Sequence, residues 1–325
     1  MDQSASIAAS KKDKIPIKEY VFGYQYVKKK IMKNKAFYVL LIPGIIYFLL
    51  FHYIPMYGAL IAFQNYSPVK GFGGSPWVGF KNFVDFFSHP SFTLVLSNTL
   101  IISFYKLIFG FPAPIIFALL LNEVKNTFLK RSIQTITYLP HFLSWIVVAG
   151  LLGTLLSPSS GILNSMLKSV GEQPIYFMAD PRFFRSVLVA SDIWKEIGWG
   201  SIIYIAAISN INAEMYEAAI VDGASRWKQT LYITIPSIIP IVIIMLILRV
   251  GSILNAGFEQ IFILYNPNVY NISDIIDTFV YRMGLEQVKF SFATAVGLFK
   301  SMIGLILILI TDRIAKMIDE EAGIW

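Results

Sequence analysis

The 325-residue sequence contains no cysteine. This absence excludes a disulfide scaffold, a cysteine-ligated zinc site and a thiol nucleophile. Charged residues are scarce, at 14% of the chain against about 25% in an ordinary soluble domain. The three histidines, His52, His89 and His141, are widely separated and lack metal-ligand spacing. The sequence therefore indicates neither an ordinary soluble domain nor a metal site.

Apolar side chains are abundant instead, at 56% of the residues, and the mean hydropathy is +0.62. A soluble core of this size does not need so many apolar residues, so the composition predicts an all-α integral membrane protein with several spans. The net charge of +7 fits basic cytoplasmic loops better than nucleic-acid binding, and we expect no nucleic-acid partner.

Six apolar runs are long enough to cross a membrane, for which a helix needs about 20 residues. Between these runs, long loops at about 64–92, 157–187 and 255–290 would share one side of the membrane. Long loops of this kind usually carry function or partner contacts. We expect the spans at about Ala36–Ile54, Ser97–Leu121, Thr135–Leu156, Leu188–Ile208, Pro236–Leu254 and Phe292–Thr311.

The basic residues predict the orientation of these spans. Residues 1–35 hold nine lysines and are expected to form a cytoplasmic tail, in which Tyr20–Lys35 fits an amphipathic surface helix. Sixteen Lys and Arg fall on the side of the termini and seven on the other, so both termini are predicted to be cytoplasmic. If the second span were two short helices, the C-terminus would lie outside instead.

The predicted cytoplasmic loop at 213–236 has a pattern of its own. Asn210 or Asn212 can cap a short helix from about Ala213, and Asp222-Gly223 would end it because glycine tolerates a positive φ. A second short helix would begin near Ala224. Small residues on both sides of the break would let another protein approach closely. A plain solvated turn is the alternative interpretation.

This loop is similar to the EAA motif of the permease subunits of binding-protein-dependent ABC importers. The family pattern is Glu-Ala-Ala, three residues, Gly, nine residues, then Ile-x-Leu-Pro. The sequence has Glu217-Ala218-Ala219, then Gly223, then Ile233-Thr234-Ile235-Pro236, with the same spacing. The one departure is Ile235, where the family pattern has leucine. Both side chains are apolar, so the exchange hardly weakens the resemblance.

Other runs resemble the polysaccharide-type branch of the sugar permeases, so the resemblance covers nearly all of the chain. The runs are Leu41-Ile42-Pro43-Gly44, Phe51 to Gly58, Ala62-Phe63, Trp77 to Phe83, Asn98-Thr99-Leu100 and Ile193 to Trp199. The resemblance implies a six-helix permease domain over 36–325 with the architecture of a type I ABC importer. It also implies a multi-pass protein of the bacterial cytoplasmic membrane.

The resemblance further implies a mechanism of alternating access. An external solute-binding protein would deliver an oligosaccharide or polysaccharide to a pair of permeases, the second being a different chain by family habit. Two cytoplasmic ATPases would bind this loop in a cleft, and their ATP-driven closure would switch the permease pair from inward-open to outward-open. The sequence has no phosphate-binding Gly-x-x-x-x-Gly-Lys-[Ser/Thr] loop, so we expect this chain to be non-enzymatic, with ATP and magnesium bound only by the partner. The expected coupling residues are Glu217, Ala218, Ala219, Asp222, Gly223 and Ala224.

Four cations fall within the predicted spans, against one clear acid, Glu196. Charges inside a span usually face a cavity or a partner. An excess of cations along a path would suit an acidic, uronate-containing sugar, although Lys106 could instead snorkel or pair with Glu196. Lys195 and Glu196 are adjacent and are not expected to share a helical face. The candidates for the substrate path are Trp194, Lys195, Trp199, Arg249, Asn255 and Lys300.

Two other classes stay open at this point. An ion-coupled secondary transporter usually needs buried carboxylates and an internal repeat, and neither is evident beyond Glu196. A membrane enzyme such as a glycan synthase would need acids, bases or metal ligands clustered at one face, and the acids here are scattered.

Overall fold

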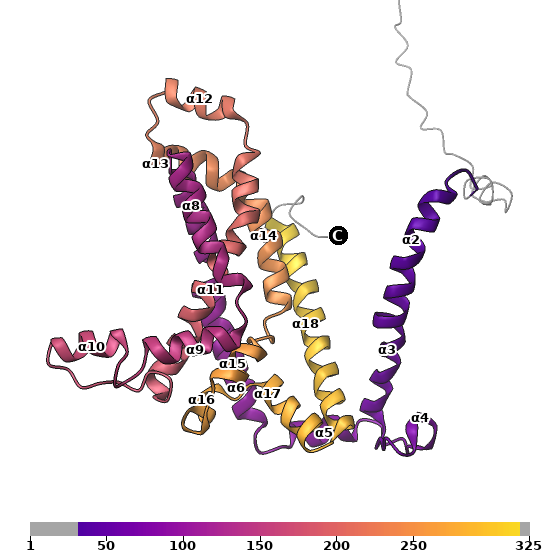
Figure 1. Ribbon diagram of the computed structural model, residues 1–325. Coiled ribbons are helices and arrows are strands. Elements are labelled where there is room, and N and C mark those ends of the chain that lie inside the picture. Colours follow the sequence, from indigo (N-terminus) through magenta and orange to yellow (C-terminus); the bar gives the residue numbers. More distant parts are fainter. Residues whose placement is uncertain (1–31, 319–325) are drawn as a thin grey trace, which may run out of the picture. The chain divides into compact units, whose positions relative to one another are not determined.

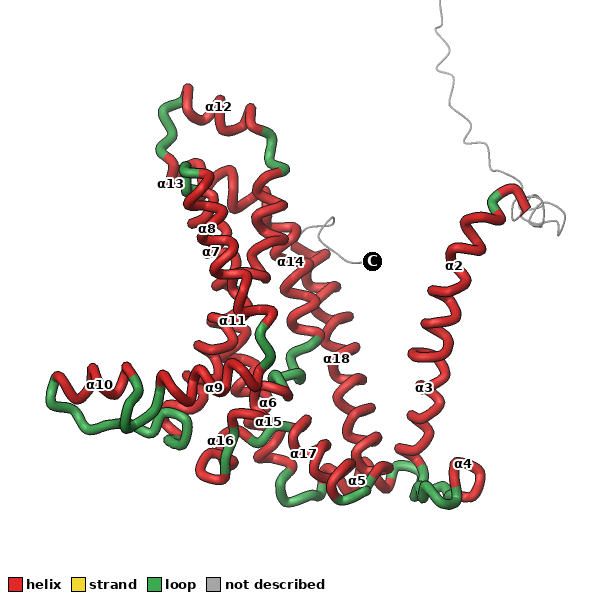
Figure 2. The backbone as a smooth tube through the Cα atoms, in the orientation of Figure 1, coloured by secondary structure: helices red, strands yellow, loops and turns green. Residues whose placement is uncertain are grey.

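The computed structural model describes residues 32–318, so most of the expected tail and its surface helix lie outside the described residues. Within 32–318 the chain forms helices and loops, with no β-strand beyond one isolated bridge between Gln64 and Trp77 (Figure 1, Figure 2). The chain divides into two compact units, residues 1–59 and 60–325.

The first unit is one apolar helical run. It comprises α2 (Lys35–Phe48), a π-helical turn (Leu49–Tyr53) and α3 (Ile54–Met56), and a 3₁₀ segment (Tyr57–Phe63) leads into the second unit. Within this unit none of the residues from Lys35 to Met56 is buried, as expected for a single apolar helix considered by itself.

The second unit begins with a series of mostly short helices and contains two long ones, α11 and α18. Its α-helices are α4 (Gly71–Gly74), α5 (Lys81–Phe87), α6 (Phe92–Tyr105), α7 (Pro112–Asn122), α8 (Thr127–Tyr138), α9 (Trp145–Leu155), α10 (Ile162–Ser169), α11 (Pro181–Ser209), α12 (Ala213–Val221), α13 (Arg226–Gln229), α14 (Ile235–Gly251), α15 (Phe258–Leu264), α16 (Tyr270–Ser273), α17 (Ile276–Tyr281) and α18 (Phe290–Ile318). The π and 3₁₀ segments are Lys106–Gly110, Leu139–Phe142, Thr230–Thr234, Pro267–Val269 and Arg282–Glu286.

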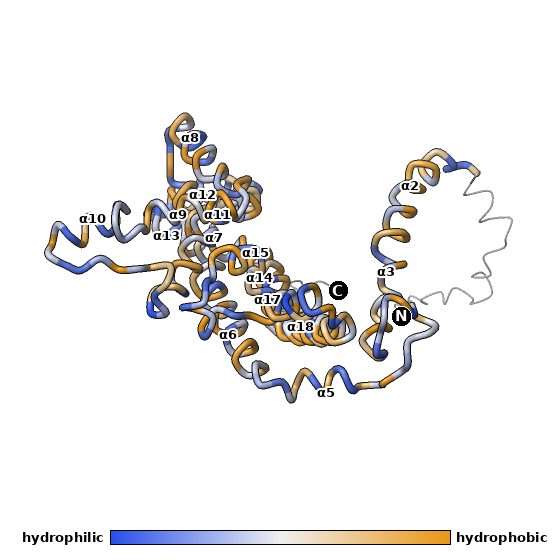
Figure 3. Tube along the Cα trace, turned by 60° about the horizontal axis from the view of Figure 1, so that its bottom comes forward, coloured by the Kyte–Doolittle hydropathy of each residue, from blue (hydrophilic) through white to orange (hydrophobic). Residues whose placement is uncertain are grey.

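Among the described residues, four helical runs could cross a membrane by length and composition: Lys35–Phe63, Phe92–Asn122, Arg226–Gly251 and Phe290–Met317. A broken pair, Thr127–Phe142 with Trp145–Leu155, would make a fifth. In Figure 3 the tube along α2 and α18 is largely orange, as expected for helices that meet hydrocarbon. The 29-residue α11 is also long enough, although its middle carries Asp192, Lys195 and Glu196.

The third predicted span, 135–156, is not one continuous helix. The chain bends by 107° between Phe142 and Trp145. Pro140 opens a short 3₁₀ turn, Leu143 and Ser144 are extended, and the Ser144 hydroxyl accepts a hydrogen bond from the N–H of Val147 to start α9. The run carries no charge and is hydrophobic on average, so hydropathy alone misses this break, although Pro140 and Ser144 are residues typical of a helix end and a helix start.

The core of the second unit is built around α11. Buried side chains of α6, α11 and α15 form one cluster, and those of α7, α11 and α14 form another. Helix α8 approaches α11 at Gly198, where a Cβ would collide with the Thr137 backbone. A third cluster, centred on Phe86, joins α5, α6, α17 and α18.

Polar contacts fix the short helices α16 and α17 at the end of the unit opposite α12 (Figure 1). Arg282 donates to both carboxylate oxygens of the buried Asp274, at 2.8 and 2.6 Å. Arg185 of α11 donates to the Asn98 side chain at 2.8 Å, and Asn98 donates to the Asp274 carbonyl at 3.1 Å. These contacts hold the segment that follows α14 in a defined position.

Candidate functional site

The loop between α11 and α14 folds into two short helices at one end of the second unit (Figure 1). Helix α12 begins after Asn212, whose side chain accepts a hydrogen bond from the N–H of Glu214 at 3.0 Å. Helix α13 begins after Ser225, whose hydroxyl accepts from the N–H of Lys228 at 3.4 Å. Of the two asparagines predicted as caps, Asn212 is therefore the one used.

Gly223 turns the chain between these helices with a φ of +76°. The N–H of Ala224 donates to the Ala219 carbonyl at 2.8 Å and that of Gly223 to the Ile220 carbonyl at 3.0 Å, which closes the end of α12. The break expected at Asp222-Gly223 is thus present. Nothing lies within 4 Å of a Cβ built on Gly223, so only the backbone conformation favours glycine there.

The outer surface of this loop is exposed and partly apolar. Ile220 is 62% exposed, Val221 87% and Trp227 73%. Glu217 is exposed too, and its carboxylate has no hydrogen-bond or ion-pair partner among residues 32–318. Its neighbours Ala218 and Ala219 add little bulk beside it. An exposed, partly apolar loop with carboxylates at Glu217 and Asp222 that are free within the described residues is suited to a groove on another protein.

Two contacts bind the loop to the helices below it. The hydroxyls of Tyr216 in α12 and Thr234 at the base of α14 are 2.9 Å apart. Arg226 at the start of α13 forms a 3.0 Å ion pair with Glu123, just after α7. A force applied to α12 would therefore reach α14 and α7 directly.

A groove of about 930 Å³ lies between α7, α11 and α14. Trp199 and Arg249 line it, together with the acids Asp192 and Glu196. The remaining lining side chains are mostly apolar and include Phe111, Trp145, Tyr204, Met245 and Leu248.

The acid overlooked from the sequence is Asp192, one turn before Glu196 on α11. Lys106 does not pair with Glu196: its ammonium lies 3.0 Å from the carboxylate of Asp192 and donates to Gln260 at 2.5 Å. Lys106 is 3% exposed, whereas the Asp192 side chain is 19% exposed and reaches the groove. The cost of a buried cation is offset here by a carboxylate and an amide oxygen.

Lys195 and Glu196 are adjacent on α11 and were not expected to share a helical face, and their charged groups nevertheless lie 3.3 Å apart. Both long side chains turn toward the break between α8 and α9. The Lys195 ammonium donates to the His141 carbonyl at 2.6 Å, and His141 Nδ1 lies 2.8 Å from the other Glu196 oxygen. Lys195 is 6% exposed and does not line the groove, which argues against its predicted place on a substrate path.

Arg249 is the remaining charge in the groove. It is exposed and has no side-chain hydrogen bond or ion pair within residues 32–318. Trp199 is 45% exposed, and the ring of His141 is stacked on it. These two path candidates thus share one groove, and the imidazole of His141 supports the indole of Trp199.

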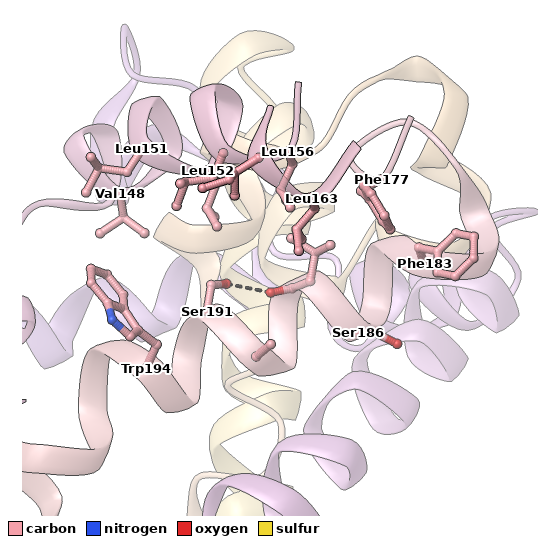
Figure 4. Close-up of a pocket in the computed structure, with 14 residues that line it drawn as sticks. Val148, Leu151, Leu152, Leu156, Leu163, Phe177, Phe183, Ser186, Ser191 and Trp194 are labelled. Atoms are coloured by element: carbon pink, nitrogen blue, oxygen red, sulfur yellow. Dashed lines mark hydrogen bonds between the residues drawn. The ribbon is translucent and has the colours of Figure 1, made fainter. Parts of the chain in front are cut away.

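The other path candidates do not line this groove. Asn255 lines a small recess with Arg249 and also, with Lys300, a hollow of about 580 Å³ near α17 and α18, where Lys300 is paired with Asp277. Trp194 borders an apolar pocket between α9, α10 and α11 (Figure 4). The six candidates therefore do not form one surface in this chain. Within residues 32–318, no three His, Asp or Glu side chains are grouped closely enough to hold a metal ion.

Comparison with known proteins identifies the family. Residues 110–322 match the family described as binding-protein-dependent transport system inner membrane component. The chain is 48% identical to Protein LplB of Bacillus subtilis (strain 168), over 90% of this chain and 92% of that protein. It is 44% identical to the polygalacturonan/rhamnogalacturonan transport system permease protein YteP of the same organism, over 91% and 92%.

A solved structure, described as a bacterial ABC transporter involved in the import of the acidic polysaccharide alginate, contains a similar chain. It is 42% identical, with a TM-score of 0.83, covering 90% of this chain and 99% of that one. A second structure of the alginate transporter, in complex with an alginate pentasaccharide-bound periplasmic protein, matches with a TM-score of 0.82 and 42% identity over 89% and 97%. The expected all-helical fold of a type I ABC permease is thereby confirmed. The chain belongs to the family of binding-protein-dependent transport system inner membrane components.

Proposed function

We propose that this chain is the permease subunit of an ATP-driven importer for an oligosaccharide or polysaccharide. The observation that carries the proposal is the groove with Trp199 and Arg249 in a chain 44% identical to a polygalacturonan/rhamnogalacturonan permease. An indole face stacks on sugar rings, and a guanidinium binds carboxylates. The family membership argues against the ion-coupled secondary transporter.

The proposed topology has six spans with both termini in the cytoplasm, α11 and the broken α8–α9 pair supplying the two spans that composition alone leaves open. The charges of α11 are compatible with a membrane position because Lys106 and Lys195 pair with its acids. The excess of basic residues beside the termini supports this orientation. The proposed location is the bacterial cytoplasmic membrane.

The loop with α12 and α13 is the proposed contact with the ATPases. Glu217 would bind basic or backbone groups there, and Ala218 and Ala219 would pack in the cleft. Asp222, Gly223 and Ala224 would shape the turn. Two partner ATPases would bind ATP and magnesium, and a second permease and an external solute-binding protein would complete the importer. The exposure of Ile220, Val221 and Glu217 supports this role.

The proposed substrate is an acidic, uronate-containing saccharide. Arg249 is a cation without an acidic partner in the groove, and the alginate transporter and YteP are named for acidic polymers. The test is purification of the full chain in mild detergent with its native partners, followed by uptake of tetragalacturonate in cells that carry or lack the gene. We expect an ATPase and a second permease to co-purify and uptake to depend on the chain. Purification of the chain alone would overturn the assignment.

A further inference from the structure

In the groove between α7, α11 and α14 both acids are paired with lysines, whereas Arg249 is not paired within the described chain. The acids that line the groove are Asp192, which lies 3.0 Å from Lys106, and Glu196, which lies 3.3 Å from Lys195. Both lysines are buried, at 3% and 6% exposure, whereas Arg249 is exposed. The two pairs cancel, so one positive charge remains, on Arg249.

The Lys106 ammonium is held where it is by a second, uncharged group. Gln260 accepts from it at 2.5 Å, and the amide of Gln260 is itself fixed by the Leu188 carbonyl at 2.7 Å and the Ser191 hydroxyl at 2.9 Å. Gln260 is 1% exposed. Gly257 passes so close that a Cβ there would lie 2.7 Å from the ammonium. Lys106 is thus held in the wall of a small recess that shares Arg249 and Ser252 with the groove.

Arg249 lies close to this pair. Arg249 and Asp192 line the same groove, and Arg249 and Lys106 line the same small recess with Ser252. Asp192 is one of the two acids that line the groove with Arg249, and its ion pair with Lys106 neutralises it as a partner for Arg249.

We propose that Lys106 is a specificity-determining residue that acts through Asp192: it neutralises this carboxylate and leaves Arg249 as the uncompensated cation that selects anionic saccharides. The inference rests on the proposed function only in taking the groove as the route of a sugar. Without Lys106 the groove has no net charge, and without Asp192 it has two positive charges. Without both, the charge of the native groove returns.

Because the chain has no cysteine, a single thiol can report this charge. Ser252 lines the groove and is exposed. In the assembled complex carrying Ser252→Cys, we would measure by intact mass how fast this chain reacts with an anionic and a cationic methanethiosulfonate of equal size. The ratio of the two rates reports the local potential. Ser209→Cys, at the far end of α11, is the control.

In the native groove we expect the ratio of the anionic to the cationic reaction rate to exceed that of the free reagents with a simple thiol. Lys106→Gln and Arg249→Gln each lower it by roughly fivefold or more, Asp192→Asn raises it, and Lys106→Gln with Asp192→Asn restores it. The ratio at Ser209→Cys stays constant. Opposite shifts with recovery in the double variant do not arise from misfolding. If Lys106→Gln does not assemble, Asp192→Asn alone tests the claim, because it should raise the ratio, and an unchanged ratio would contradict the role of the pair.

The inference would be overturned if neither Lys106→Gln nor Asp192→Asn changed the rate ratio at position 252. The electrostatic potential in the groove would then not depend on this ion pair. Uptake of tetragalacturonate separates this from the proposed function. We expect it to fall at least about tenfold in Lys106→Gln and to recover in the double variant. Shifted rate ratios without any tetragalacturonate uptake in the native transporter would refute the proposed substrate and leave the charge arrangement standing.

Discussion

The imidazole of His141 lies flat on the indole of Trp199, with ring centroids 4.5 Å apart and planes at 2°. His141 belongs to the break between α8 and α9, and Trp199 belongs to α11. The contact between His141 Nδ1 and Glu196, at 2.8 Å, fixes the imidazole in this position. One face of the indole is therefore covered by protein, and its orientation in the groove is set by residues from two helices.

Replacing Trp199 by alanine should weaken sugar uptake, because the groove would lose its stacking surface. A stacked aromatic contact is worth about 0.5–1.5 kcal/mol, so the half-saturating concentration of saccharide should rise roughly two- to tenfold. Trp199→Phe keeps a ring, so its half-saturating concentration should lie between those of the native protein and Trp199→Ala. Initial uptake rates across a range of saccharide concentrations measure this. Equal values in all three proteins would remove Trp199 from the substrate path.

Replacing Lys195 by methionine should destabilise the chain. The variant leaves the His141 carbonyl without its donor and Glu196 without its lysine, at a cost of about 1–3 kcal/mol for a charged hydrogen bond. The melting temperature of the purified complex should drop in Lys195→Met. In Lys195→Arg it should stay close to the native value. A further Glu196→Gln change should recover part of the loss. An unchanged melting temperature in Lys195→Met would show that this contact does not support the break.

Removing the hydroxyl of Tyr216 should loosen the link between α12 and the base of α14 without unfolding either helix. Tyr216→Phe keeps the ring and loses only the 2.9 Å contact with Thr234. We expect ATP hydrolysis to continue while sugar transported per ATP decreases. The matched control is Tyr232→Phe, because that residue is 71% exposed in the same segment. Identical ratios of transport to hydrolysis in both variants would contradict this role for Tyr216.

Arg282→Gln should destabilise the segment after α14, since it leaves the buried Asp274 carboxylate unpaired. Breaking one side of such a pair costs about 3–5 kcal/mol. Asp274 also raises the pKa of Arg282 above its ordinary value. A raised pKa contributes stability that is lost only as the pH rises through it, so the loss should be the same at about pH 6 and pH 9. The measurement is the difference in melting temperature between the native chain and Arg282→Gln at each pH. A difference found at only one pH would contradict this expectation.

The helical membrane fold and the two-helix loop followed from local signals. Long apolar runs identify helices for lipid, and Asn212, Gly223 and Ser225 act through their own backbone. The resemblance at Glu217 to Gly223 pointed to the family that the comparisons identify. These features depend on residues close together in the chain.

The arrangement of the groove could not be inferred in the same way. Lys106 meets Asp192 and Gln260 across sequence separations of 86 and 154 residues. Helical spacing on α11 does not predict that Lys195 turns to the His141 carbonyl, because that contact depends on the break between α8 and α9, 54 residues earlier in the chain. The choice among Trp194, Arg249, Asn255 and Lys300 depends on the same long-range packing.

The central claim is that the loop at 213–236 couples this chain to an ATPase, and Gly223 tests it most directly. With a φ of +76° and no neighbour within 4 Å of a Cβ, Gly223 is sensitive to backbone conformation alone. Asparagine tolerates this conformation and valine does not. We would measure ATP hydrolysis stimulated by sugar-loaded binding protein in Gly223→Asn and Gly223→Val complexes. The account predicts stimulation near the native level with asparagine and its loss with valine, whereas full stimulation with valine would contradict it.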